Sequence, residues 1–191
     1  PSAYDRVFID TGWESPVTYR HLDELEKTIG TITRIKSSVE IPEAHRDFVE
    51  SIEDRLGFQS AFVRFVIKWG YFPAGNRKWC TSVLKLDPLK KYYDSLDFVP
   101  INATGVRWEE GGKRASRKRI EWFDYLDCYV FRPIIHYTET DVIDIHKRFG
   151  LSPNPMYISG SDRVGCYPCI LSKKKEILNL DKKRISVVRD L

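Results

Sequence analysis

Three of the four cysteines lie in contexts that favour chemistry over packing. Cys166 and Cys169 form a C-x-x-C pair in the turn 165–169, and Cys80 lies in the basic stretch 77–81. Both segments stand at expected helix starts, where exposed N–H groups lower the pKa of a thiol and favour the thiolate that binds metals. Three such thiolates brought together suit a [4Fe-4S] cluster.

Two other interpretations of the cysteines stay open. The three can be unconnected, with the C-x-x-C pair acting as a thiol couple, or all four can bind a structural zinc ion. Cys128 argues against zinc, because it lies in the apolar, strand-like stretch 125–131, where cysteine is usually a small core residue. The fourth iron of a cluster would bind Cys128, a non-cysteine ligand or substrate sulfur.

Cations surround the predicted thiol site. Arg77, Lys78 and Lys85 flank Cys80, and Arg163 precedes the C-x-x-C pair. These charges should lower the thiol pKa further, because a nearby cation stabilises the thiolate. They could also hold an anionic substrate beside the sulfur.

A second charged constellation is the stretch 105–114. Arg107 and Arg114 carry forked donors suited to phosphate or sulfate oxygens, and Glu110 is placed to orient one of them. Five of the seven residues in 113–119 are basic, which would attract nucleic acid or the phosphates of a nucleotide. The alternative is a solvated loop or helix face with incidental charges.

The composition is that of one globular domain. The chain has 191 residues, of which 42% are hydrophobic and 30% charged. No apolar run is long enough to span a bilayer, and no secretory signal is visible. Four cysteines are too few for a disulfide scaffold, so we expect a reducing cytoplasm. The net charge of +4 is mild and does not by itself indicate nucleic-acid binding.

The elements that must position these residues alternate between strands and helices. Strands are expected at 6–10, 31–37, 98–106 and 129–135. Helices are expected at 17–29, 42–56, 58–69, 81–96, 138–150 and 167–180. This alternation favours an α/β fold with a parallel sheet. In such sheets ligands bind at the carboxyl ends of strands, where Asp10, the loop 103–107 and the residues after Ile135 would lie.

These pieces in this order resemble the phosphoadenosine-phosphosulfate (PAPS) reductase family, in the N-type ATP-pyrophosphatase group of adenine nucleotide α-hydrolases. The resemblance covers nearly the whole chain and rests on the stretches 10–19, 70–89, 105–114, 132–142 and 154–169. It implies a doubly wound parallel sheet with an adenylyl nucleotide across the strand ends. Residues 1–150 would form this α/β domain, with a helical insertion at about 42–96. A cysteine-containing loop and helix at 151–191 would pack on the same domain.

The resemblance also implies roles for individual residues. The nucleotide pocket would be lined by Asp10, Thr11, Gly12 and Glu14. The phosphate or sulfate end would meet Gly105, Arg107, Glu110 and Arg114, with Lys85 and Arg163 completing the cofactor-binding set. In the iron-sulfur members, cysteines like Cys80, Cys166 and Cys169 carry a [4Fe-4S] cluster beside that end.

The sequence departs from the family pattern in three places. The phosphate loop, a Ser-Gly-Gly-Lys-Asp-Ser-like turn after the first strand, is absent, and we expect it and its strand to lie upstream of Pro1. The double cysteine of assimilatory reductases is a single Cys80, and the serine expected after Glu110 is Gly111. No cysteine follows Cys169, so the C-terminal nucleophile of a true reductase is missing.

The missing nucleophile favours sulfur-transfer relatives, such as the DNA phosphorothioation sulfurtransferases and tRNA thiolation enzymes. There, ATP with magnesium adenylates an oxygen, and sulfur held on the open iron of a three-cysteine cluster displaces AMP. Cys80, Arg107 and Arg114 would be catalytic. The implied partners are an adenine nucleotide, DNA or tRNA as acceptor, and a sulfur-donor protein such as a cysteine desulfurase, with no membrane.

Two alternatives to sulfur transfer remain. One is a phosphoadenylyl- or adenylyl-sulfate reductase whose thiol lies beyond this chain or is supplied in trans. The other is a non-catalytic module that binds nucleotides or nucleic acid and contains a structural metal.

Overall fold

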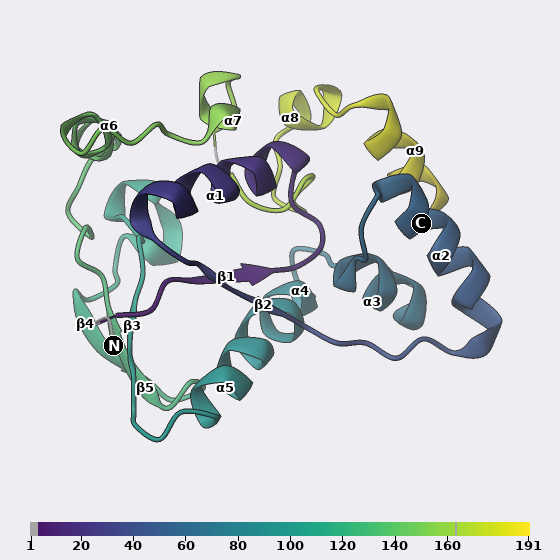
Figure 1. Cartoon of the computed structure of the whole chain (residues 1–191), viewed down its shortest axis with the longest axis horizontal. Helices are drawn as coiled ribbons and strands as arrows, with labels where there is room; N and C mark the ends of the chain where they lie inside the picture. Colours follow the sequence, from purple (N-terminus) through teal and green to yellow (C-terminus); the bar gives the residue numbers. More distant parts are fainter. Residues whose placement is uncertain (1–3, 163) are drawn as a thin grey trace. The chain divides into compact units, whose positions relative to one another are not determined.

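The computed structural model describes residues 4–162 and 164–191 (Figure 1). The chain divides into two compact units, the first formed by Pro1–Pro88 with Asn154–Leu191 and the second by Leu89–Pro153. Within the described ranges, no helix has the length and apolar character needed to cross a membrane. The division into domains at 1–150 and 151–191 stays a prediction, since compact units need not coincide with the domains of a family.

The first unit opens with a strand–helix–strand element. β1 (Val7–Asp10) and β2 (Thr33–Lys36) pair in parallel, with Asp10 opposite Lys36. Parallel neighbours need a crossover connection, and α1 (Pro16–Ile29) supplies it. The predicted parallel α/β arrangement is confirmed here, and both strand ends bring their last residues to the same edge.

Three helices of the first unit enclose a hydrophobic core. They are α2 (Arg46–Leu56), which follows the short 3₁₀ turn η1 (Glu43–His45), α3 (Ala61–Trp69) and α9 (Lys182–Asp190). α2 and α9 lie side by side (Figure 1). Arg55 donates to Ser186 Oγ at 2.9 Å and to Asp190 at 2.6 Å. The core contains Trp13, Ile52, Leu56, Phe62, Val63, Phe65, Val66, Trp79, Leu84 and Val187.

The helical stretch expected at 81–96 changes its helix type just before Pro88. It consists of α4 (Trp79–Thr81), the π-helical segment η2 (Ser82–Leu86) and α5 (Asp87–Asp94). In π winding, the Val83 carbonyl would accept from the N–H of Pro88, which has none. Ser37 Oγ donates to that carbonyl instead, at 2.5 Å. The expectation that Pro88 bends or restarts the helix is confirmed.

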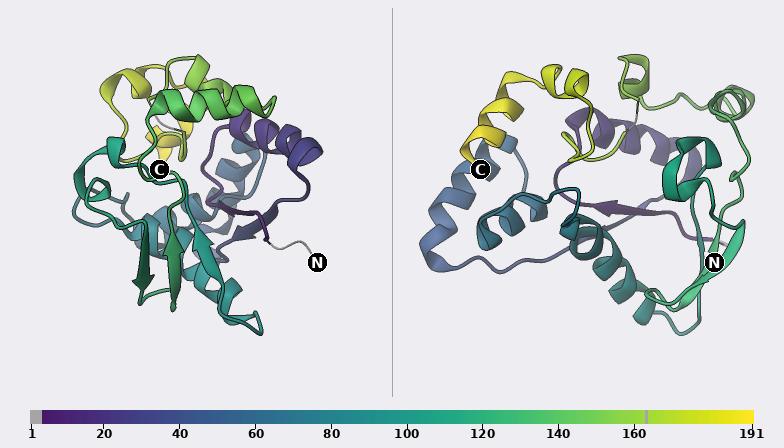
Figure 2. Two further views of the ribbon diagram at one scale, coloured as in Figure 1. Left: turned by 90° about the vertical axis from the view of Figure 1, so that its left-hand side faces the viewer. Right: turned by 180° about the vertical axis from the view of Figure 1, so that it is seen from behind.

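The second unit contains a three-stranded sheet (Figure 2). Its order is β3 (Ile101–Ala103), β5 (Cys128–Phe131) and β4 (Ile120–Phe123), with β3 parallel and β4 antiparallel to β5. We did not predict β4, because the basic run before it was interpreted as a loop or helix face. Two 3₁₀ turns, η3 (Trp108–Glu110) and η4 (Gly112–Arg114), lie between β3 and β4.

Helix ends follow the predicted signals at two positions. α6 (Glu139–Arg148) begins after Thr138, which exchanges hydrogen bonds with Asp141 as a capping box. α1 ends at Gly30, whose φ of +87° is unfavourable for other residues and whose N–H bonds to the carbonyl of Glu26. Both caps fix where the flanking loops start.

The helix predicted at 167–180 is wrong. The structure has a short α7 (Pro155–Ile158) before the cysteines, α8 (Lys174–Leu178) after them, and α9 beyond. Pro168 has no N–H to donate, and the N–H of Leu171 points to Cys169 Sγ at 3.5 Å. The C-x-x-C pair therefore lies in a non-helical turn.

Candidate functional site

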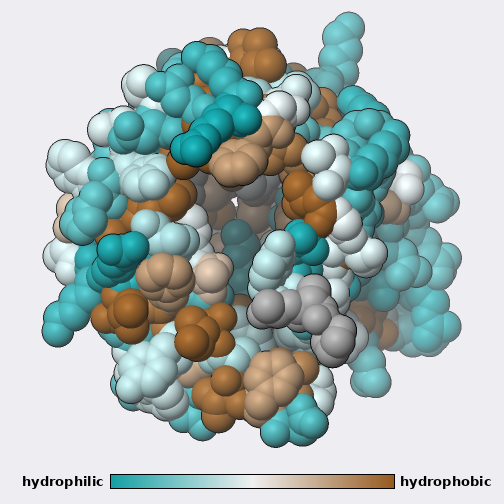
Figure 3. Space-filling view, turned by 60° about the vertical axis from the view of Figure 1, so that its left-hand side comes forward, coloured by the Kyte–Doolittle hydropathy of each residue, from teal (hydrophilic) through white to brown (hydrophobic). Residues whose placement is uncertain are grey.

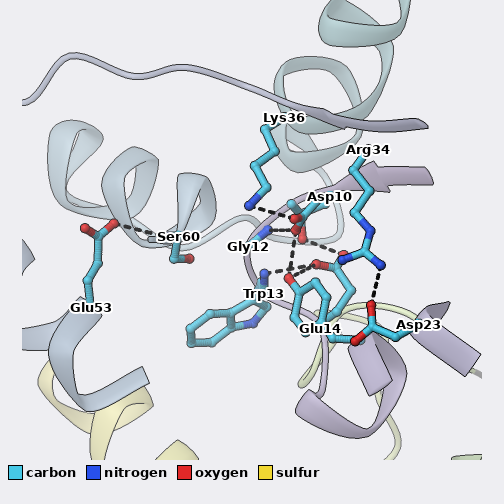
Figure 4. A network of polar contacts seen from close by, with 11 residues as sticks. Asp10, Gly12, Trp13, Glu14, Asp23, Arg34, Lys36, Glu53 and Ser60 are labelled. Carbon is cyan, nitrogen blue, oxygen red and sulfur yellow. Dashed lines mark hydrogen bonds and ion pairs between the residues drawn. The ribbon is translucent and has the colours of Figure 1, made fainter. Parts of the chain in front are cut away.

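The carboxylate of Asp10 shapes the turn that follows β1. It is almost fully buried, and its Oδ1 accepts from the Gly12 N–H at 2.8 Å and from the Tyr19 hydroxyl at 2.7 Å. Its Oδ2 pairs with Lys36 Nζ at 2.9 Å (Figure 4). Both oxygens therefore have partners inside the first unit, and the ion pair follows directly from the register of the two strands.

Gly12 allows this turn to approach the start of α3. Its φ is +66°, and a Cβ at this position would lie 2.6 Å from Ser60 Cα and 2.9 Å from the Ala61 nitrogen. No side chain fits there without displacing backbone. The close approach also lets the N–H of Phe62 donate to the Thr11 carbonyl at 3.0 Å.

Glu14 is the second buried carboxylate of the same segment. It accepts from Thr11 Oγ1 at 2.7 Å, from the Trp13 N–H at 3.1 Å and from the Tyr19 hydroxyl at 3.1 Å. Burial raises its pKa above the ordinary value, and the charge of Asp10 adds to this effect. Burial and the neighbouring carboxylates also raise the pKa of Tyr19, which keeps it a proton donor.

The turn with the C-x-x-C pair is fixed to this segment. The Tyr167 N–H donates to the Trp13 carbonyl at 2.7 Å, and the indole N–H of Trp13 donates to the Pro168 carbonyl at 3.0 Å. The backbones of Cys166 and Glu14 also pair as a single antiparallel β-bridge. The hydroxyl of Thr11 lies 3.9 Å from Cys166 Sγ. Segments far apart in the sequence thus meet at the end of β1.

Cys80 is positioned by the aromatic residue before it. Trp79 is buried and packs on Phe62 with ring centroids 5.8 Å apart and on Trp69 at 4.9 Å. Cys80 and Cys166 are both half-buried against the same hydrophobic core. The sequence alone does not show this convergence, because it depends on how α3 and α4 pack.

Cys80, Cys166 and Cys169, called the thiol site below, share one electrostatic environment. The charge of Cys169 acts on both other thiols, and Lys85 is the cation that stabilises the thiolates of Cys80 and Cys166. The structure therefore brings together the three cysteines that the sequence singled out, together with one of the predicted cations. Arg163 lies outside the described residues.

The expected lowering of the thiol pKa is wrong for two of the three cysteines. Burial raises the pKa of Cys166 to about 11 and also raises the pKa of Cys80, and the opposing effect of Lys85 is smaller in both. Each is a neutral thiol at pH 7 in the absence of a bound cation. A metal would have to displace these protons, so its binding should release them.

The thiol site, as the structure has it, does not fit a single metal ion. In residues 4–162 and 164–191, no three His, Cys, Asp or Glu side chains are close enough to hold one metal ion. A single zinc ion would therefore require the thiols to move together. A cubane binds each cysteine at a different iron, so its ligand sulfurs lie farther apart than the ligands of one ion. The charge of Cys169 acts on both other thiols, so the three lie in one neighbourhood, as a shared cubane requires.

Cys128 differs from the other cysteines. It is fully buried in β5 of the second unit, and burial raises its pKa. This is the position of a small core residue, as the apolar sequence around it predicts.

The predicted anion-binding loop lies in the second unit. Glu110 accepts from the Arg107 backbone N–H at 3.1 Å and pairs with the guanidinium of Arg114. The Trp108 N–H donates to the Ile135 carbonyl at 2.8 Å, so the loop is bonded to the segment after β5, as expected for one sheet edge. An incoming phosphate or sulfate would compete with Glu110 for Arg114. Gly105 lies at the start of this loop with a backbone that any residue could adopt.

Sequence reasoning missed two residues of the Asp10–Glu14 environment. Lys36 could have been found from the strand register, since it ends β2 opposite Asp10. No feature of the sequence pattern indicated that Arg184 of α9 belongs to this environment. Its guanidinium lies 4.3 Å from the Trp13 ring and donates to the Glu14 carbonyl at 3.2 Å. Burial lowers its pKa, and its Nη1 has no hydrogen-bond partner among the described residues.

The parallel strand pair and its crossover helix define an α/β protein, and the turn after β1 is bonded to the segment that carries Cys166 and Cys169. Residues 3–172 match the family model of the phosphoadenosine phosphosulfate reductase domain, and the chain belongs to that family. The resemblance drawn from the motifs is thereby confirmed.

Two known proteins similar to this chain are longer than the part that it matches. An uncharacterized 37.8 kDa protein of Escherichia phage 186 is 30% identical over 91% of this chain and 61% of its own length. An adenosine 5'-phosphosulfate reductase of Bacillus pumilus is 26% identical over 85% of this chain and 61% of its own length. The chain thus spans about three fifths of these two relatives.

A solved structure shows the same fold. The phosphoadenylyl-sulfate reductase of Candida auris, in a phosphate complex, superposes with a TM-score of 0.59 and 19% identity. The superposition covers 87% of this chain and 71% of the other. At this identity the likeness establishes the α/β fold alone.

Proposed function

We propose that the protein containing this chain is an ATP-dependent sulfurtransferase that carries a [4Fe-4S] cluster on Cys80, Cys166 and Cys169. The observation that supports this most is that Cys80 and Cys166 pack on the same core and that the charges of Cys169 and Lys85 act on both. The chain's fourth cysteine is buried in β5. The three are thus the sulfur ligands that this chain offers.

The chain's own residues would hold the thiol site rigid and balance its charge. Trp13 fixes the C-x-x-C turn through its indole N–H, and Trp79 fixes Cys80 through ring packing. Lys85 would offset part of the negative charge that three thiolates bring. When bound, a three-cysteine cluster supplies one iron without a protein thiol, at which a sulfur atom can be held.

Each unit carries residues predicted to bind the nucleotide. The Asp10–Lys36 pair keeps the turn at 10–14 in shape, with Gly12 and Glu14 inside it. Arg107 and Arg114 offer guanidinium groups for a phosphate, held in register by Glu110. Magnesium would accompany ATP, as is usual for triphosphates. The phosphate loop that the family uses would come from residues upstream of this chain.

The reaction conserves atoms and needs no net redox change. An oxygen of the acceptor attacks the α-phosphorus of ATP, and the bond to pyrophosphate breaks. A sulfur at the sulfide level then attacks the atom that carries the adenylated oxygen, and the carbon–oxygen or phosphorus–oxygen bond breaks to release AMP. We propose DNA or tRNA as the acceptor and a protein such as a cysteine desulfurase as the sulfur donor. A cytoplasmic setting would keep the thiols reduced.

The second candidate is reduction of an adenylyl sulfate. It is favoured by the relatives named adenosine 5'-phosphosulfate reductase, such as those of Bacillus pumilus and Salinibacter ruber. Here a thiol would attack the sulfate sulfur and release AMP, and a second thiol would release sulfite and form a disulfide. Because Cys80, Cys166 and Cys169 would be engaged as ligands, the attacking thiol would have to come from outside this chain.

Product analysis separates the two candidates. The full-length protein, purified without oxygen, is incubated in parallel with ATP, nucleic acid and sodium sulfide, and with adenylyl sulfate plus a dithiol. The proposal predicts pyrophosphate and AMP from ATP, and loss of AMP release in Cys80→Ser. Sulfite from adenylyl sulfate, without pyrophosphate from ATP, would contradict it and establish the reductase.

A further inference from the structure

One buried arginine contacts the place where the C-x-x-C turn meets the segment after β1. Figure 3 shows hydrophilic side chains spread over one face of the protein, and the surface is where arginines usually lie. Arg184 of α9 is instead only 3% exposed. Burial of a guanidinium costs free energy, which its contacts must offset. The nature of those contacts therefore indicates the role of this side chain.

The turn junction, as we call it, consists of three contacts that connect the segment after β1 with the C-x-x-C turn. The Tyr167 N–H donates to the Trp13 carbonyl, and the Trp13 indole N–H donates to the Pro168 carbonyl. The β-bridge between Glu14 and Cys166 is the third. Because these contacts involve the first cysteine and the two residues between the cysteines, they determine where both sulfur atoms of the pair lie.

Arg184 contacts both sides of the turn junction. Its guanidinium carbon lies 4.3 Å from the centre of the Trp13 ring and 5.6 Å from the centre of the Tyr167 ring. Its Nη2 donates to the Glu14 carbonyl at 3.2 Å. Aromatic rings attract a cation over their face most strongly where water is excluded. One side chain thus holds the segment after β1 and the turn at the same time.

The backbone of α9 keeps Arg184 in this position. Asp181 caps the helix by accepting from the Arg184 N–H at 2.8 Å, and Val187 is fully buried in the core. α9 also packs on α2, where Arg55 donates to Asp190. The guanidinium therefore projects from a helix that is anchored by contacts away from the turn.

We propose that Arg184 is a positioning residue of the thiol site, which keeps Cys166 and Cys169 in place for the cluster by connecting the two sides of the turn junction. This inference deepens the proposed function and rests on it, because the cluster is what the turn would hold. The turn junction itself forms without metal.

A purely space-filling role makes a different prediction. Methionine has an unbranched apolar side chain that fills core space well, so it would replace an arginine that only packs. Holding the turn requires a planar cation that contacts two rings and a carbonyl at once. Lysine keeps the charge but lacks the planar fork, so it should replace Arg184 only in part.

Hydrogen exchange in the metal-free, full-length protein tests the turn junction without the cluster. Selective isotope labelling of tyrosine, tryptophan and phenylalanine lets NMR follow the Tyr167 amide and the Trp13 indole N–H. In Arg184→Met both should exchange about tenfold faster than in the wild type, because exchange reports local opening. Arg184→Lys should lie between the two, and it supplies the readout if the methionine variant does not fold.

Two controls separate the turn junction from general stability. The Phe62 N–H donates to the Thr11 carbonyl of the same segment at 3.0 Å, and its exchange should not change in Arg184→Met. Arg55→Met removes contacts between α2 and α9 but leaves Arg184 in place, so the Tyr167 amide should exchange as in the wild type. Circular dichroism shows whether each variant folds.

The cluster-loaded protein gives a second readout. Because the turn is less firmly held, Arg184→Met should lose iron to a chelator about tenfold faster and should change the electron paramagnetic resonance spectrum of the reduced cluster. Arg184→Lys should restore the wild-type spectrum in part, whereas Arg55→Met should retain it.

Unchanged exchange of the Tyr167 amide in Arg184→Met would overturn the proposal. An equal acceleration in Arg55→Met would also overturn it, because the effect would then arise from the packing of α9. So would a wild-type Tyr167 amide without protection, since the turn junction would not exist in the metal-free protein. A colourless wild type whose Tyr167 amide loses its protection in Arg184→Met would contradict the proposed function alone.

Discussion

The segment 10–14 of the first unit and the loop 105–114 of the second both carry charged residues predicted to meet a ligand, but they are built differently. In the first, Asp10 and Glu14 are at most 3% exposed, and each carboxylate oxygen has a partner inside the first unit, one of which is the exposed Lys36. In the second, Glu110 and Arg114 pair at the surface. Core packing fixes the first segment, whereas solvent-exposed ion pairs hold the second.

This difference shows which part of each site can yield to a ligand. Exposed ion pairs contribute little to stability, so an anion can displace Glu110 from Arg114 at small cost. A buried carboxylate cannot leave its donors without exposing unsatisfied groups. The side chains of Asp10 and Glu14 are therefore fixed by the fold, whereas those of the loop 105–114 can rearrange around an anion.

Alanine at two glycines should give the largest contrast. Gly12 and Gly111 have φ of +66° and +70°, so alanine strains the backbone at both. Only at Gly12 does the new Cβ meet backbone, 2.6 Å from Ser60 Cα. We expect Gly12→Ala to reduce the free energy of unfolding by about 2–6 kcal/mol and Gly111→Ala by about 1–3 kcal/mol. Urea denaturation measures both, and equal losses would show that the close approach of Gly12 is unimportant.

Removal of one charge tests the adaptable loop. Glu110→Gln keeps an acceptor for the Arg107 N–H but eliminates the carboxylate that occupies Arg114. Affinity for sulfate should rise severalfold, because the anion no longer displaces a competing charge. Isothermal titration calorimetry with sodium sulfate measures this, with Glu43→Gln, far along the chain on η1, as control. A fall in affinity would mean that Glu110 orients the arginine instead.

The smallest expected effect is on two exposed aspartates. Lys173 and Lys175 lower the pKa of Asp162 to about 2, whereas hydrogen bonds from Thr138 lower the pKa of Asp141. Salt screens ion pairs more than short hydrogen bonds. The pKa of Asp162 should therefore rise toward its ordinary value in high salt, and that of Asp141 should stay low.

The sign of the accompanying stability change follows from the direction of the shift. A lowered carboxyl pKa stabilises the folded state above the unfolded pKa, so the contribution of Asp162 is lost as pH falls from 3.8 towards about 2. Carbon-detected NMR titration at low and high salt measures both groups. An equal response of the two aspartates to salt would refute the distinction.

The sequence predicted the local features of the fold and left out those that depend on packing. The parallel pair of β1 and β2, the caps at Gly30 and Thr138 and the disturbance at Pro88 follow from residue types that act on their own backbone. β4 escaped prediction because its alternation is short and starts inside a basic run. α9 was not predicted, although Asp181 caps its first turn, because its position depends on packing against α2.

The candidate site divides in the same way. Spacing and context singled out Cys80, Cys166 and Cys169, and in the structure Cys80 and Cys166 pack on one core while the charge of Cys169 acts on both. The raised pKa values could not be foreseen, since they arise from burial among residues distant in sequence. The contact of the Arg184 guanidinium with the Trp13 ring could not be predicted either, because it depends on how the C-terminal helix α9 packs.

Iron analysis after anaerobic reconstitution with iron and sulfide tests most directly whether Cys80, Cys166 and Cys169 bind one cluster. We predict about four irons and a broad visible absorption band for the wild type and for Cys128→Ser, and loss of both in Cys80→Ser, Cys166→Ser and Cys169→Ser. A brown Cys80→Ser protein with full iron content, or a colourless wild type, would contradict the claim that these three cysteines hold one cluster.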